Sequence, residues 1–109
     1  MALGKTLVNG SRTVRAIQWD GTLPSAQALL PEIRQHGVLA SAKQRLVVLS
    51  RNPDGSPNQT EMRTTLGLQF GQTIRNVGSG DWAASENGRP LIIAGSDVGE
   101  GKTWTEQAP

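Results

Sequence analysis

The nine residues from Met62 to Phe70 constrain the fold of this chain more than any other segment. They read Met-Arg-Thr-Thr-Leu-Gly-Leu-Gln-Phe, so that larger apolar or β-branched side chains alternate with polar residues and glycine. A period of two puts every second side chain on the same face of an extended chain. The segment therefore predicts a β-strand with one buried face, which neighbouring elements must cover.

Several other segments predict strands. The residues from Thr13 to Trp19 are rich in β-branched and aromatic types. Val14 and Ala16 would lie on one face of this strand and Ile17 and Trp19 on the other, so we expect both of its faces to be covered. Further strand material lies at 38–42, 44–50, 82–85 and 91–93.

Turn residues separate these strands. Asn87-Gly88 predicts a hairpin turn between the last two apolar segments. The residues 52–58 read Asn-Pro-Asp-Gly-Ser-Pro-Asn, which predicts a loop, because proline fixes φ and glycine permits the left-handed conformation.

One helix is expected after the first of these strands. Thr22 can cap it, Pro24 is tolerated in its first turn, and Gly37 is placed to end it. Pro31 lies inside the predicted helix, where it removes a hydrogen bond and clashes with the preceding turn. We therefore expect a break or kink near Leu30.

These elements predict a single small α+β domain, with one short kinked helix packed on a mainly antiparallel sheet of four to five strands. We expect the domain to span residues 1–95 with a loose N-terminal arm, or a short edge strand in its place, and residues 96–109 to form a Gly-rich extended tail. The chain has 109 residues, one Phe and no Tyr. Its core must therefore be small, and an oligomer contact could supplement it.

Composition excludes several classes of function. No cysteine is present, which removes disulfides, thiolate chemistry and the usual structural zinc ligands. No apolar run is long enough for a signal peptide or a membrane span, so we expect no membrane association. The formal net charge is only +2, which gives a weak field and does not favour nucleic acid as a partner.

The segment from Gly95 to Thr103 is the nearest approach to a catalytic motif. An apolar strand precedes its glycines and it ends in Gly-Lys-Thr, as in a phosphate-binding loop. Such a loop needs a helix immediately after the lysine, and only six residues follow Thr103. The sequence therefore predicts no nucleotide hydrolysis, and His36, the only histidine, has no evident catalytic partner.

Asp20 and Asp81 each lie beside a tryptophan and a glycine. Brought together by adjacent strands, the two carboxylates could share a proton or bind a cation. The simpler interpretation is that each one makes turn hydrogen bonds to the backbone.

Partner-binding residues are predicted in two places. A sheet could gather Arg15, Arg45 and Arg63 on one face, which would suit either a solvated surface or single-stranded nucleic acid. Trp104, with Lys102 nearby, lies in the polar tail and could anchor a partner surface. Trp104 could equally fold back over its own sheet.

Two short motifs carry a resemblance to a known group of proteins. The first, Val14 to Trp19, has the pattern V-x-A-x-Q-W, and the second is Gly80-Asp81-Trp82. A helix and a strand containing Thr-Thr-Leu-Gly are expected between them. This order resembles small proteins of tailed bacteriophages, most of them without a known activity, over roughly Thr13 to Ile93.

The resemblance and the absent catalytic constellation together predict a non-enzymatic protein without a cofactor. We expect a small phage accessory protein in the cytoplasm of the bacterial host, where it binds a host or phage protein and could inhibit a host process. The alternative is a minor or decorating structural protein of the virion, whose extended termini bind neighbouring copies in a homo-oligomer. A single-stranded nucleic-acid binding module is the third interpretation.

Overall fold

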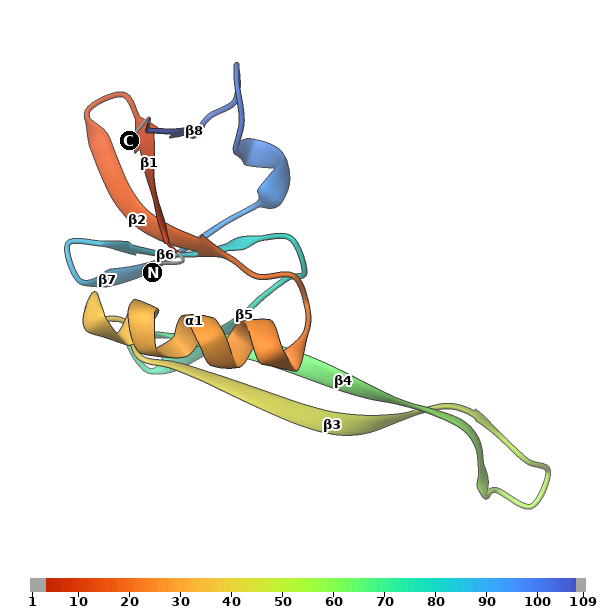
Figure 1. Cartoon of the computed structure of the whole chain (residues 1–109). Coiled ribbons are helices and arrows are strands. Elements are labelled where there is room, and N and C mark those ends of the chain that lie inside the picture. The colour runs from red at the N-terminus through yellow and green to blue at the C-terminus, as the bar shows by residue number, and fades with distance from the viewer. Residues whose placement is uncertain (1–3, 108–109) are drawn as a thin grey trace.

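Two antiparallel sheets and one helix make up the computed structural model, which describes residues 4–107 (Figure 1). The elements in chain order are β1 (Lys5–Asn9), β2 (Arg12–Gln18), α1 (Leu23–Gln35), β3 (Ala40–Arg51), β4 (Pro57–Phe70), β5 (Thr73–Val77), β6 (Trp82–Glu86), β7 (Arg89–Ile93), the 3-10 turn η1 (Gly95–Asp97) and β8 (Thr105–Glu106). Sheet A has the order β7-β6-β2-β1-β8, and sheet B has the order β3-β4-β5. The α+β prediction is confirmed, but the strands divide into two sheets where one was expected.

Strands β2 and β6 pair at the centre of sheet A and are buried on both faces. On one face, Ile17 and Trp19 join a core with the helix and sheet B, which we call core one. On the other face, Val14 and Ala16 join a second core, which we call core two. The prediction that this strand is covered on both sides is confirmed.

The members of the two cores come from different parts of the chain. Core one contains Ile17, Trp19, Ala26, Leu29, Ile33, Val38, Leu66, Leu68, Val77 and Ala83. Core two contains Leu7, Val14, Ala16, Trp82, Ala84, Ile93 and Trp104. All three tryptophans are therefore core residues, as expected for Trp19 and Trp82.

The helix begins and ends where the sequence predicts. The Thr22 hydroxyl accepts a hydrogen bond from the Ser25 amide at 3.3 Å, and Gly37 has a φ of +86° just after the last turn. The helix continues through Pro31 without the expected break. Pro31 and Gln27 are exposed, so water can bond the Gln27 carbonyl that loses its helical donor.

Both ends of the described chain are docked on sheet A. Strand β1 lies between β2 and β8, so the expectation of a loose N-terminal arm is wrong for residues 5–9. Residues 95–106, here called the C-terminal segment, bend through η1, and their strand β8 pairs with Leu7 and Val8. The expected extended tail is therefore wrong for residues 96–107, while residues 108–109 lie outside the described residues.

The physical reason for this docking is the second apolar face of sheet A. Trp104 is only 6% exposed because it closes core two against Leu7 and the central strands. Two backbone hydrogen bonds hold it, one from its amide to the Asp97 carbonyl and one from the Gly99 amide to its own carbonyl, both 2.9 Å long. Sequence neighbours of Trp104 are polar, but its neighbours in space are not.

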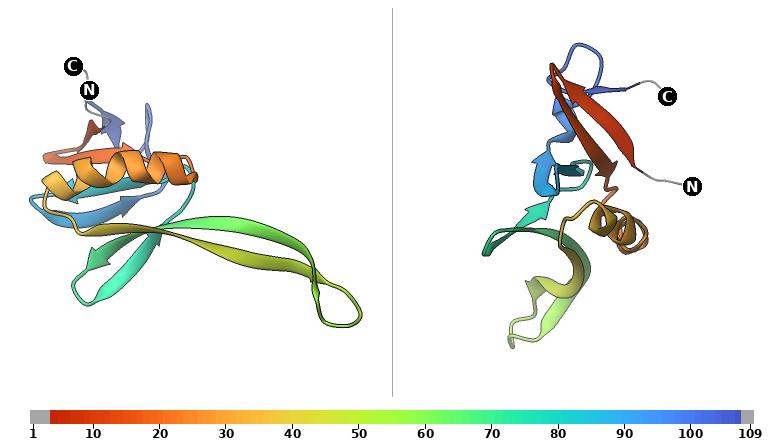
Figure 2. Two further views of the ribbon diagram at one scale, coloured as in Figure 1. Left: turned by 60° about the horizontal axis from the view of Figure 1, so that its bottom comes forward. Right: turned by 90° about the vertical axis from the view of Figure 1, so that its left-hand side faces the viewer.

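Strands β3 and β4 extend far beyond the rest of the molecule (Figures 1 and 2). The molecule measures 59 Å along its longest axis and 29 and 28 Å along the others. The turn at the tip is closed by a hydrogen bond from the Asn52 amide to the Ser56 carbonyl, 2.8 Å long. The predicted loop is therefore confirmed at 52–56, while Pro57 and Asn58 already belong to β4.

The late hairpin also matches its prediction. Strands β6 and β7 are joined by Asn87 and Gly88, both with positive φ (52° and 80°). Positive φ at both central residues fits the turn whose twist suits a tight antiparallel pair.

Removal of the Trp104 side chain should strongly destabilise the fold. We expect Trp104→Ala to lower the free energy of unfolding by about 3–5 kcal/mol, because it opens a cavity in core two. The measurement is chemical denaturation of the full chain, with Thr103→Ala at the exposed neighbouring position as the control. Equal stability of the two variants would contradict the docking of the C-terminal segment.

Candidate functional site

The most prominent candidate site is the projecting part of the β3–β4 hairpin, residues 43–65, which we call the arm. Alternate cross-strand pairs of an antiparallel ladder share a face. The pair Ala42–Leu66 contributes to core one, and the pair Leu46–Met62 lies two places further along the same face. The face that packs on the core inside the body thus continues onto the arm.

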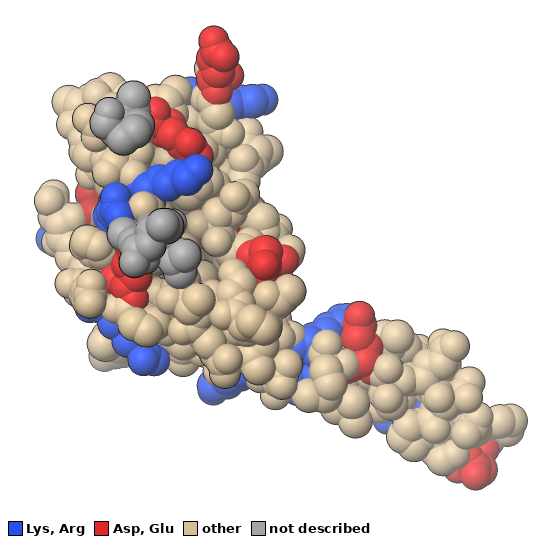
Figure 3. Space-filling model, viewed as in Figure 1, with Lys and Arg blue, Asp and Glu red and all other residues tan. Residues whose placement is uncertain are grey.

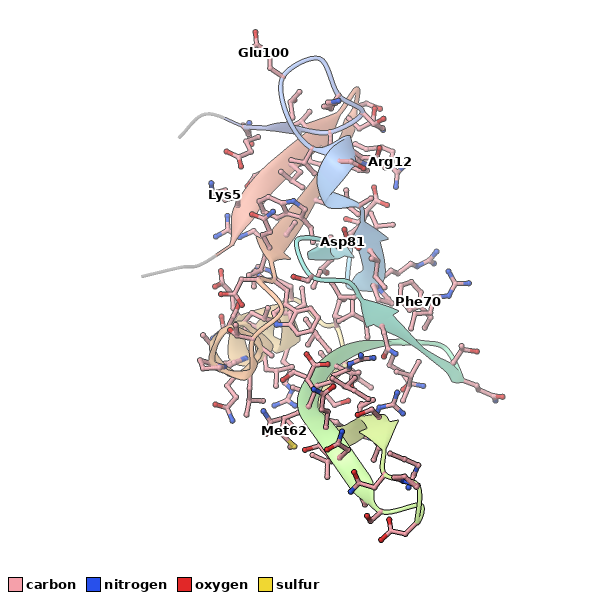
Figure 4. All side chains as sticks on the ribbon, turned by 90° about the vertical axis from the view of Figure 1, so that its right-hand side faces the viewer. Lys5, Arg12, Met62, Phe70, Asp81 and Glu100 are labelled. Carbon is pink, nitrogen blue, oxygen red and sulfur yellow. The ribbon has the colours of Figure 1, made fainter. Side chains whose placement is uncertain are left out.

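On the arm this apolar face has no cover. Leu66 is fully buried, whereas Leu46 is 60% exposed and Met62 is 55% exposed. Met62 lies at the surface of the arm in Figure 4. The predicted one-sided burial of the strand is therefore confirmed at Leu66 and Leu68 and wrong at Met62.

Exposed large apolar residues are concentrated on this part of the molecule. Of the five in the described chain, Leu46, Leu49 and Met62 lie on the arm, and the other two, Leu39 and Ile74, lie at the base of sheet B. An apolar surface gathered on one element indicates an interaction site rather than random exposure. A two-stranded ribbon without a covering layer is also only marginally stable in water. Both features make the arm the candidate contact surface of the described chain.

The opposite face of the arm is basic. Arg45 and Arg63 are direct cross-strand partners, and Lys43 lies on the same face. Arg63 is paired with Glu61 at 3.0 Å, and both side chains are about half exposed. Like charges placed opposite each other repel, so an acidic partner would relieve the arginine pair.

The net charge of the chain resides on the arm. It carries four basic and two acidic residues, while the rest of the chain has seven of each. In Figure 3 most of the arm surface is tan, so uncharged side chains lie between its few charged groups.

Arg15 does not join the other two arginines, contrary to the prediction. It lies on β2 in sheet A, with its guanidinium 3.4 Å from the Glu32 carboxylate. The separation follows from the division of the strands into two sheets. The structure thus brings together Arg45 and Arg63 only.

Lys102 and Trp104 lie in the C-terminal segment but differ in exposure. Lys102 is exposed in a turn, where its amide donates to the Gly99 carbonyl at 3.1 Å. Trp104 is buried, and the Arg12 guanidinium lies over its ring, 5.1 Å from the ring centre. The prediction that the Trp104 indole is an exposed anchor is therefore wrong.

The two tryptophan motifs meet in one structural junction. The Trp19 amide donates to the Asp81 carbonyl at 3.0 Å, and the Gly80 amide donates to the Trp19 carbonyl at 2.7 Å. The Trp19 indole donates to the Thr22 carbonyl at 2.9 Å, which ties the junction to the start of the helix. The motifs thus hold the fold together and do not form an open site.

The Asp20 and Asp81 side chains serve this junction separately. Asp20 accepts hydrogen bonds from the hydroxyl and the amide of Thr22, at 2.6 and 2.9 Å. These bonds lower the pKa of Asp20, whereas a proton shared between two carboxylates would raise the pKa of one of them. Asp81 accepts from the Gly95 amide at 2.9 Å. The turn interpretation therefore accounts for both residues.

The Gly-rich segment does not have the geometry of a phosphate-binding loop. Gly95 begins the short turn η1, and its amide already bonds the Asp81 carboxylate. Thr103 is followed by Trp104 and β8, with no helix in the described residues 104–107. A carboxylate thus holds the donor that a phosphate would need.

Other elements of the described chain, residues 4–107, add no further chemistry. His36 caps the helix, where its carbonyl accepts from the Ser85 hydroxyl at 2.8 Å. Within this range no group of three or more His, Cys, Asp or Glu side chains could hold a metal ion. No described helix is long and apolar enough to cross a membrane.

Comparison with known proteins found no matching family model, no matching curated protein and no matching solved structure.

The geometry of the Gly-rich segment predicts that the protein does not bind nucleotides. Calorimetric titration of the full chain with ATP or GTP and magnesium should show no heat of binding. Micromolar binding that disappears in Lys102→Ala would contradict this, with Lys43→Ala as the control for a loss of positive charge.

The hydrogen bonds to Asp20 predict a carboxyl group that titrates below the ordinary aspartate pKa. Because the folded pKa is lowered, the stability that this carboxylate contributes is present above its ordinary pKa and is lost as the pH falls through the lowered value. Carbon NMR of the carboxyl groups measures this midpoint.

Thr22→Ala should raise the Asp20 midpoint, because the hydroxyl donor is removed. Asp54 is an internal control, since the amide and hydroxyl of Ser56 lower its pKa in the same way and would be unaffected. An unchanged Asp20 midpoint in the variant would contradict the assigned hydrogen bond.

Proposed function

We propose that this chain is a non-enzymatic protein-binding protein of a tailed bacteriophage and that the arm is its contact element. The observation that carries the proposal is one face of sheet B, which is buried in the body at Leu66 and uncovered on the arm, where it presents the apolar pair Leu46–Met62. A surface of this kind gains free energy when another polypeptide covers it.

The size of the gain is consistent with a real contact. Full burial of a Leu or Met side chain contributes roughly 1.5–3 kcal/mol relative to full exposure. Leu46, Leu49 and Met62 are each more than half exposed in the isolated chain. Covering them would also order a ribbon that has no second layer of its own.

Among the protein-binding roles, we favour a structural component of the virion that contacts neighbouring copies. The arm reaches well beyond the body that carries it, which suits contact between subunits placed side by side (Figure 2). The role of an accessory protein in the host cytoplasm would use the same arm on a host or phage protein. We prefer the virion role, because in an assembly of repeated subunits every copy gains one contact through its arm.

Single-stranded nucleic acid is less well supported as a partner. Binding of this kind relies on aromatic faces that stack with bases. Trp19, Trp82 and Trp104 are 3–6% exposed, and the basic face of the arm carries no aromatic side chain.

Charged substitutions on the apolar face of the arm should weaken self-association. We expect the double variant Leu46→Asp and Met62→Asp to sediment as a smaller species than the wild type, because the apolar contact is lost while the buried core is untouched. Sedimentation velocity over a range of protein concentrations measures this, and circular dichroism checks the fold.

The matched control is Leu39→Asp, which changes a leucine that is 70% exposed but lies outside the arm. A control that dissociates as fully as the double variant would argue against the arm as the contact element. For the virion role, mass spectrometry of purified particles should find the wild-type chain in many copies, and its absence would favour the accessory role.

A further inference from the structure

We propose that the arm of one copy docks into an open pocket on a second copy, beside the C-terminal segment, and so links the copies head to tail. This inference rests on the proposed function and names the partner of the arm.

The pocket is lined by both apolar and acidic side chains, and the carboxylates of Glu100 and Glu106 are called the rim carboxylates here. It encloses about 500 Å³ between the ends of β2 and β6 and the C-terminal segment. Trp82 and Val98 contribute apolar surface, and Glu100 and Glu106 contribute carboxylates. This volume lies within the range of pockets that accept inserted groups. Such a pocket would fit a ligand that carries both apolar and basic side chains.

The arm has this chemistry. Leu46 and Met62 form one cross-strand pair on its apolar face, and the next pair along the ladder towards the body is Arg45–Arg63. Arg45 and Arg63 follow on the other face, and their long side chains can reach around the edge of a two-stranded ribbon. We infer that the apolar pair covers Trp82 and Val98 while the guanidinium groups approach the rim carboxylates.

Charge complementarity supports a second copy as the occupant. The C-terminal segment carries three acidic residues and one basic residue, a net charge of −2, while the arm carries four basic and two acidic residues, a net charge of +2. Glu106 is paired with Lys5, at 3.2 Å, and both side chains are about half exposed. Opposite patches of this kind steer association and fix its orientation.

The two surfaces lie at opposite ends of the molecule. In Figure 4 Glu100 lies at one end and Met62 near the other, and Figures 1 and 2 show the arm directed away from the C-terminal segment. The arm therefore does not lie in the pocket of its own chain. A contact between two different surfaces is heterologous, so repetition produces a ring or a filament.

The competing arrangement stacks two arms on each other through their apolar faces. It would bring together two elements that each carry a net charge of +2 and would leave the rim carboxylates of the pocket without a basic partner from another copy. Electrostatic repulsion disfavours it relative to docking in the pocket.

Charge reversal distinguishes the two arrangements. The arm variant carries Arg45→Glu and Arg63→Glu, and the pocket variant carries Glu100→Lys and Glu106→Lys. Each variant alone should self-associate at least about tenfold more weakly than the wild type, because like charges meet at the contact. Mixing the two variants should restore large species, since every arm then finds a pocket of opposite charge.

Sedimentation velocity at low salt measures these species, with melting temperatures as the check on folding. The control is Arg89→Glu, which reverses an exposed charge on β7 away from both surfaces. Restoration on mixing, with the control unchanged, supports the proposal. Restoration is the decisive readout, because a variant that merely fails to fold cannot be rescued by mixing.

Two results would overturn the proposal and leave the proposed function standing. One is a pocket variant that associates like the wild type while the arm variant does not, which would assign the arm to another surface. The other is a wild-type chain that stays monomeric at every concentration, which would assign the arm to a different protein. If the wild type associates and neither the arm variant nor Leu46→Asp with Met62→Asp weakens it, the arm is not the contact element and both proposals fail.

Discussion

The pairing of β2 with β6 is the interaction on which the rest of the structure depends. These two strands are distant in sequence, and their backbone ladder continues past the strand ends through the bonds between Trp19 and the Gly80-Asp81 turn. Because side chains alternate along each strand, the pair presents apolar residues to both sides. One side takes the helix and sheet B, and the other takes the C-terminal segment. A break in this pair would therefore separate both cores at once, whereas loss of the helix would expose core one and loss of β1 would expose core two.

The interactions that the sequence could predict are those set by local residue types. Alternation in Val14 to Trp19 indicated two covered faces, the Thr22 cap and Gly37 indicated the helix bounds, and Asn87-Gly88 indicated the late hairpin. Each of these depends on conformational preferences that act within a few residues. The docking of Trp104 could not be predicted in this way, because its apolar neighbours come from other strands and include Leu7, Val14 and Ala16, about ninety residues earlier. The same limit explains Arg15, whose distance from Arg45 depends on which sheet each strand joins.

The arm is uncovered because the helix is shorter than the hairpin on which it packs, and both lengths follow from the sequence. A helix rises about 1.5 Å per residue and a strand about 3.3 Å, so the thirteen residues of α1 span roughly 20 Å while the twelve residues of β3 span roughly 40 Å. One helix can therefore cover only about half of the hairpin that packs on it. The sequence predicts 38–42 and 44–50 as separate strand segments, and two short segments do not reveal the mismatch. A single continuous strand from Ala40 to Arg51, paired with an even longer β4, leaves its distal half without a layer.

The apolar residues on the uncovered half of the hairpin bear on both the stability of the chain and its proposed function. The two cores are small and are built mostly from aliphatic residues and three tryptophans. That Leu46, Leu49 and Met62 lie outside these cores is then informative, because alanine or serine there would leave the isolated chain at least as soluble. Apolar side chains on an unlayered ribbon stabilise the ribbon only when something packs on them. The arm is therefore the contact element that we propose, and a partner that covered it would also stabilise the ribbon.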